Sequence, residues 1–93
     1  MPKYLQNKVA GYYLYYTMHC IIECMHAHAS DKHLTEAGSA KFFVNSDGSS
    51  VVQHRGTLTD REINQIQKYI KMHYMEMYAL WSTDSENGFY DEK

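Results

Sequence analysis

The sequence predicts an α+β fold in which a small antiparallel sheet of three to four strands packs on one long C-terminal helix. Residues 11–54 contain short aromatic or β-branched runs separated by turn residues, as strands do. From residue 59 onward, apolar residues recur every three or four positions, as on one side of a helix. A length of 93 residues corresponds to one domain. We expect the sheet over 11–54, the helix over 59–82, and flexible ends at 1–10 and 83–93.

Two runs in the first half alternate as strands. The first is "GYYLYYTM", which begins at Gly11 and is aromatic on both faces. The second is "MHAHAS" at 25–30, where Ala27 and Ala29 share one face and His26 and His28 share the other. The two alanines leave room for the helix to approach closely. The opposite face, which carries Tyr and His, is expected to stay partly open to a partner.

A hairpin is predicted over residues 40–54, "AKFFVNSDGSSVVQH". The "NSDG" segment is a tight turn, because Asn and Asp bond to nearby backbone and Gly48 adopts positive φ readily. The hairpin therefore supplies two further strands.

The helix has a clear start. Thr59 and Glu62 form a capping box, and Leu58 and Ile63 are spaced as a hydrophobic staple. After the helix, the polar tail is expected either to fray or to be held by its aromatic residues, Phe89 and Tyr90. The core stripe comprises Ile63, Ile66, Ile70, Tyr74, Met77 and Trp81, and a wider arc that packs on the sheet or meets a partner comprises Tyr69, Met72, Met75 and Tyr78.

Charge and composition exclude some classes of protein. The net charge of −2, without a basic run, argues against strong non-specific binding to nucleic acid. The sequence contains neither a run of about 20 apolar residues nor the apolar segment of a signal peptide, so we expect a cytoplasmic protein without a membrane span. Cys20 and Cys24 lack the C-x-x-C spacing and are expected to be thiols.

The segment "HCIIECMHAH" at 19–28 is a candidate metal site. His26 and His28 project from one face of a strand and could chelate one divalent metal such as zinc, which needs three or four ligands. The alternative is that both imidazoles have structural or interface roles and that no cofactor is present. The first further candidate ligands are Glu23 and His54, and the next candidates are His19 and Cys24.

The order of features resembles a widespread bacterial family of short domains of unknown function. The shared features are "GYYLYY", "MHAHAS", a hairpin, "HRGTLTDREI" and a closing "YALW", so the resemblance covers Gly11 to Trp81. The "RG-x-L" segment of the family is matched by Arg55, Gly56 and Leu58.

This resemblance implies a sheet-plus-helix fold, with His26 and His28 as the signature pair. The family carries Pro directly before H-x-H, where this chain has Cys24 and Met25. Family genes often lie in toxin–antitoxin-like or mobile-element neighbourhoods, and no established activity accompanies them.

Two functions follow as hypotheses. The first is a small interaction protein of toxin–antitoxin or defence/counter-defence type, which binds a partner protein through Tyr13, Tyr15, Tyr78 and Arg55. The second is a small metal-dependent hydrolase or ribonuclease that uses His26 and His28, with RNA as a possible substrate. A version without metal would use the two histidines as acid and base. A homodimer is also expected, since small sheets with an open edge pair readily.

Overall fold

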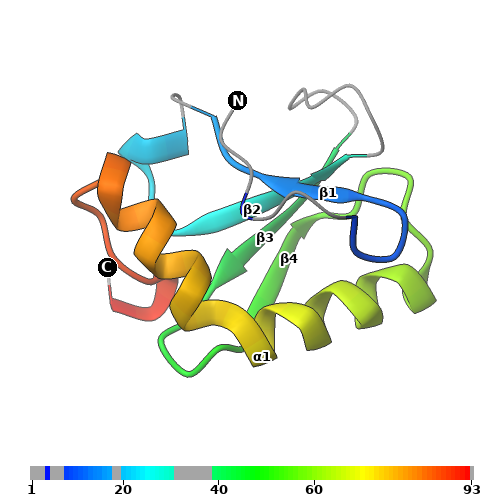
Figure 1. Ribbon diagram of the computed structural model, residues 1–93. Helices are drawn as coiled ribbons and strands as arrows, with labels where there is room; N and C mark the ends of the chain where they lie inside the picture. Colours follow the sequence, from blue (N-terminus) through cyan, green and yellow to red (C-terminus); the bar gives the residue numbers. More distant parts are fainter. Residues whose placement is uncertain (1–3, 5–7, 18–19, 31–38, 93) are drawn as a thin grey trace.

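The structure is a computed structural model and describes residues 4, 8–17, 20–30 and 39–92 (Figure 1). Four strands form one sheet in the order β1-β2-β3-β4, and every neighbouring pair is antiparallel. The helix α1 lies across one face of this sheet, so the predicted α+β fold is confirmed (Figure 1). The elements are β1 (Tyr13–Tyr15), η1 (Cys20–Ile22), β2 (His26–Ser30), β3 (Ala40–Val44), β4 (Ser50–His54), α1 (Asp60–Asp84) and η2 (Tyr90–Glu92).

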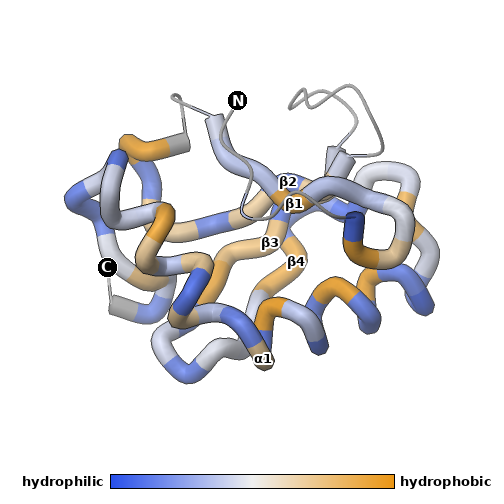
Figure 2. The backbone as a smooth tube through the Cα atoms, viewed as in Figure 1, coloured by the Kyte–Doolittle hydropathy of each residue, from blue (hydrophilic) through white to orange (hydrophobic). Residues whose placement is uncertain are grey.

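The core lies between α1 and the sheet. In the strand register Leu14 is opposite Ala29, and Ala27 is opposite Phe42, so these side chains share the face toward the helix. Ala27 and Ala29 are fully buried, as expected for positions where the helix approaches closely. Figure 2 shows apolar colour through the central strands and in bands along α1. The helix contributes Ile63, Ile66, Ile70, Met77 and Trp81.

Helix α1 begins at the predicted capping box. The Glu62 amide donates to Thr59 Oγ1 at 3.2 Å, and the Thr59 amide donates to Glu62 Oε1 at 2.9 Å. Leu58 and Ile63 are both buried, as a hydrophobic staple requires. The local signals therefore place the start of the helix correctly, and its end at Asp84 lies two residues beyond the predicted one.

The first strand is shorter than predicted. Residues from Gly11 were expected to be extended, but Ala10 and Gly11 both have positive φ and form a turn that pairs Val9 with Tyr12. Only Tyr13–Tyr15 pair with β2 as a strand.

The hairpin between β3 and β4 agrees with the prediction. The Asn45 amide donates to Ser49 O at 2.8 Å, and Gly48 has φ 89°. The Ser49 hydroxyl and amide both donate to the Asp47 carboxylate, and these bonds hold the pKa of Asp47 below its usual value. Between Lys41 and Phe42 the register shifts, which leaves Gln53 as the extra residue of a bulge.

The C-terminal segment, residues 85–92, is held against the sheet. This agrees with the second of the two expectations for the polar tail, that its aromatic residues hold it in place. The Met25 amide donates to Gly88 O at 2.9 Å. Phe89 is buried and stacks on Tyr78 with 4.3 Å between ring centroids, and Tyr90 stacks on Phe43 at 4.4 Å. This segment therefore closes the end of the sheet at which β2 begins.

The face of the sheet opposite α1 differs from the expectation of an open surface. Tyr15 and His26 are fully buried, and His28 and Phe43 are nearly so. The prediction of an open Tyr- and His-bearing face was therefore wrong for these positions. Alternation along a strand assigns side chains to faces, but it does not reveal what covers each face.

Candidate functional site

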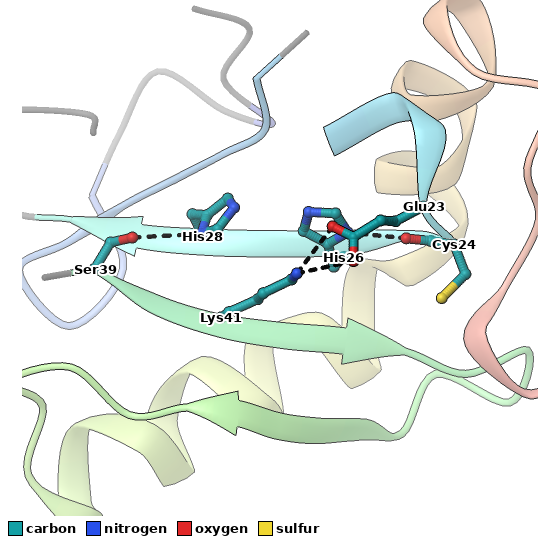
Figure 3. Close-up of polar contacts among 6 residues, drawn as sticks. All are labelled: Glu23, Cys24, His26, His28, Ser39 and Lys41. Atoms are coloured by element: carbon teal, nitrogen blue, oxygen red, sulfur yellow. Dashed lines mark hydrogen bonds and ion pairs between the residues drawn. The ribbon is translucent and has the colours of Figure 1, made fainter. Parts of the chain in front are cut away.

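The two histidines of β2 lie next to each other inside the protein. Their ring centroids are 5.2 Å apart with the planes nearly perpendicular. His26 Nδ1 is 2.9 Å from the Cys24 carbonyl oxygen, which can only accept, so Nδ1 is the nitrogen that carries the proton (Figure 3). The rings of Phe43 and Trp81 contact His26 at 5.6 and 5.5 Å between centroids. His26 is thus a core side chain with a fixed tautomer.

A lysine–glutamate ion pair lies beside the histidines. Lys41 reaches from β3 to Glu23, with its Nζ at 2.9 and 3.2 Å from the two carboxylate oxygens (Figure 3). The same ammonium group stands 4.9 Å from the centroid of the Phe43 ring, within the range of a cation–π contact. Glu23 is therefore neutralised by a lysine.

Ser39 connects His28 with His54, two further candidate ligands. Its hydroxyl lies 3.3 Å from His28 Nδ1, and its carbonyl oxygen accepts from His54 Nδ1 at 3.0 Å. His28 is buried next to Tyr15, whereas His54 is exposed at the end of β4. The bulge after Lys41 brings His54 to this position, because it sets His54 opposite Lys41 in the register.

The predicted metal ligands are near one another in the fold but do not converge. Across the described ranges of the chain, no three His, Cys, Asp or Glu side chains are grouped so that they could hold a metal ion. Glu23 bonds to Lys41, and His26 and His54 each donate to a backbone carbonyl. His19 lies outside the described residues, as does the side chain of Cys20. The zinc site remains a prediction from the sequence.

A pocket of about 420 Å³ opens at the end of the sheet, where η1, β3 and the C-terminal segment meet. The side chain of Ile22 stands at its edge and is 80% exposed, the largest value among the exposed large apolar residues of the described chain. Figure 2 shows the apolar colour of η1 at this outer position. The lining residues are Ile22, Glu23, Cys24, Phe43, Glu86, Asn87 and Gly88.

The four predicted partner-binding residues do not form one surface. Tyr15 is fully buried, so its predicted contact with a partner is not available in this structure. Tyr13 is half-buried beneath the Lys8 ammonium, and Tyr78 is half-buried under Phe89. Arg55 is exposed, but it forms an ion pair with Asp60 at the start of α1 and donates to Leu58 O.

The wider apolar arc of the helix divides into two parts. Tyr69 and Tyr78 are half-buried against the core, whereas Met72 and Met75 are 77% and 60% exposed. The methionines therefore point away from the sheet. Of the two expectations for the arc, packing on the sheet does not apply to them, and contact with a partner stays a prediction.

Sequence reasoning did not identify several residues of the site. Lys41 had a usable signal, because a charged residue inside the apolar run "AKFFV" needs a partner when the strand is buried. Ile22 and the segment from Glu86 to Gly88 had none, since they are more than 60 positions apart in the chain and meet only in the fold.

The fold and this site define a class: a small α+β protein with a buried histidine pair, an adjoining Lys–Glu ion pair and an acidic-edged pocket. The part of the chain that the structure describes contains no helix long and apolar enough to cross a membrane. No protein-family model matches the chain, and the searches of curated proteins and of solved structures return no match. The bacterial family resemblance therefore remains a prediction.

Proposed function

We propose that this chain is a small interaction protein that binds a partner protein at the pocket between η1, β3 and the C-terminal segment. The observation that carries the proposal is an exposed isoleucine beside a pocket of about 420 Å³. A pocket that receives an anchoring side chain, next to an apolar side chain that protrudes, is the usual centre of a protein–protein contact. This role agrees with the toxin–antitoxin or defence type of protein that the sequence predicted.

The chemistry of the lining favours a cationic anchor. Phe43 and Ile22 provide apolar surface for the stem of a long side chain, and the Glu86 carboxylate lies at the edge. Glu23 is already paired with Lys41, so Glu86 is the pocket carboxylate that a partner's charge would approach. Arginine and lysine combine an apolar stem with a charged head and match such a lining. The proposed partner therefore presents a basic side chain next to an apolar one.

The pocket is built by hydrogen bonds that are already in place. Ile21 O accepts from Ser85 Oγ at 2.7 Å and from Asn87 Nδ2 at 2.8 Å, which ties η1 to the C-terminal segment. Trp81 Nε1 donates to Asn87 O at 2.8 Å and anchors the same segment to α1. A partner would meet a formed pocket, and binding then loses little free energy to ordering the walls.

A display library of random 12-residue peptides tests the proposal. Wild-type protein is expected to enrich peptides with arginine or lysine beside an apolar residue, and Ile22→Glu and Glu86→Lys are each expected to weaken the best peptide by about tenfold or more. Val51→Glu is the matched control, because Val51 is also an exposed apolar residue but lies on β4, outside the pocket. Failure to enrich any peptide, or equal binding by all variants, would overturn the proposal.

The metal-dependent hydrolase has less support from the geometry. Its two histidines are buried, and the pocket is lined by Glu23 and Cys24 but by neither histidine. The geometry therefore favours the interaction role over the hydrolase.

A further inference from the structure

Helix α1 carries a second stripe on the side away from the sheet. This outward stripe comprises Arg61, Gln65, Lys68, Met72, Met75 and Ala79, which recur at alternating spacings of four and three and are all exposed. Such spacing places the six residues along one line of the helix, and its apolar members are Met72, Met75 and Ala79. The sheet does not cover these three residues, because the core positions of α1 lie on the opposite side.

The apolar part of the stripe is substantial. Met72 and Met75 are adjacent on the helix and expose 77% and 60% of their surface. Methionine adapts its shape well to a partner surface. Removing the two side chains from water would provide a favourable contribution near the middle of a helix of 25 residues. A contact centred there would extend along the helix in both directions.

The charges along the outward stripe are separated. Arg61 and Lys68 lie in the first half of α1. The carboxylate of Glu76 lies in the second half, where it is 80% exposed and 3.2 Å from His73 Nδ1. Asp60 and Glu62 do not cancel the cations of the first half, since Asp60 pairs with Arg55 and Glu62 bonds to the Thr59 amide. The outward side of α1 thus changes from positive to negative on the two sides of Met72.

We propose that a second copy of this chain covers the outward stripe, with the two α1 helices antiparallel about a two-fold axis near Met72. In this arrangement Met72 packs on Met72 of the partner subunit, and Met75 lies one helical turn away on the same side of the contact. Lys68 lies beside Glu76 of the partner subunit, and the symmetry forms this pair twice. A parallel pairing would instead bring Lys68 against Lys68 of the partner subunit, which like charges disfavour.

The inference is independent of the proposed function. No residue that lines the pocket belongs to α1, so pairing through the outward stripe leaves both pockets of the dimer open. The dimer would present two partner sites on one particle. A variant that loses dimerisation could still be tested for partner binding, and a variant that loses partner binding could still be tested for dimerisation.

Sedimentation velocity of the full chain tests the pairing. Wild-type protein at concentrations up to about 1 mM is expected to approach twice the 10.9 kDa chain mass. Lys68→Glu and Glu76→Lys are each expected to raise the dimer dissociation constant about tenfold, and the double variant is expected to restore it. Within one helix these residues are about 12 Å apart along the axis, so rescue cannot come from a pair inside one chain.

Two further variants make the outcome decisive. Lys8→Glu changes the net charge by the same amount at an exposed residue outside α1 and should leave the dimer unchanged. The double variant Met72→Glu/Met75→Glu should remain monomeric, with the circular dichroism spectrum of the wild type. A wild-type monomer at every concentration, single charge reversals without effect, or a charge-swapped variant that stays monomeric would each overturn the proposal.

Discussion

Gly48 lies directly against the ring of Tyr74: a Cβ atom at Gly48 would stand 2.6 Å from Tyr74 Cδ1 and 3.2 Å from the Lys71 carbonyl oxygen. The turn between β3 and β4 is therefore locked onto the middle of α1. Position 48 requires glycine for two reasons. A Cβ atom would clash with Tyr74, and the φ of 89° is unfavourable for any residue with a side chain.

Gly48→Ala is expected to lower the free energy of unfolding by about 3 kcal/mol, which combines backbone strain with overpacking against Tyr74. Gly11→Ala is the matched control. Gly11 has nearly the same φ, but a Cβ atom there would meet nothing within 4 Å. Its cost should be backbone strain alone, about 1–2 kcal/mol. Urea denaturation measures both, and equal losses would contradict a close contact at Gly48.

The capping box gives a second prediction. Thr59→Ala removes the acceptor of the Glu62 amide and should cost about 1 kcal/mol in urea denaturation. Thr57→Ala, two positions earlier at an exposed residue, should cost little. Equal effects of the two substitutions would argue against the capping box as the source of stability.

The decline of the free energy of unfolding at low pH should also depend on Glu62. The bond from the Thr59 amide, and further bonds from the Thr59 and Tyr12 side chains, hold the pKa of Glu62 below its usual value. Because the folded pKa is depressed, this contribution is present above the unfolded pKa and is lost as pH falls through the folded pKa. Glu62→Gln should flatten the decline of stability with acid, and a curve parallel to the wild type would refute this.

Tyr16 predicts a loss of stability in strong base. Burial, followed by a bond of 2.7 Å to Asp84, raises the pKa of Tyr16 to about 12. Because the folded pKa is raised, the stabilisation is complete below the unfolded pKa near 10 and is lost as pH rises toward 12. The advantage of wild type over Tyr16→Phe, about 1 kcal/mol at pH 8, should therefore disappear near pH 12. An advantage that does not change with pH would exclude this role.

Metal analysis separates the two sequence hypotheses. Since Glu23 is paired with Lys41 and His26 bonds to a backbone carbonyl, the purified protein is expected to retain no stoichiometric metal ion. Elemental mass spectrometry of wild type beside His26→Ala provides the measurement. One ion per chain in the wild type, lost in the variant, would establish the metal site and reverse the order of the two proposed functions.

The sequence predicted what depends on neighbours along the chain. The start of α1 follows from Thr59 and Glu62, which are three positions apart, and the β3–β4 turn follows from "NSDG". The sharing of one face by His26 and His28 follows from the two-residue period of a strand. These features required no knowledge of the rest of the fold.

The candidate site was less predictable because it depends on distant contacts. The burial of Tyr15 and His26 depends on what covers the second face of the sheet. The alternation of side chains along a strand does not predict that cover. The partner of Glu23 comes from β3, and the pocket needs residues 22–24, Phe43 and residues 86–88, which are far apart in the sequence. Of the candidate site residues assigned from sequence, Glu23 and Cys24 line the pocket.

The bond from the Met25 amide to Gly88 O also has a consequence for synthesis. This bond, like the stacking of Tyr90 on Phe43, joins the region of β2 and β3 to residues that are synthesised only after α1. A ribosome-bound chain that has emerged only as far as α1 would already have all four strands, but the entrance to β2 would lack its closing segment. Chaperones that hold exposed apolar chain are therefore expected to release this sheet only after residues 88–90 have left the exit tunnel.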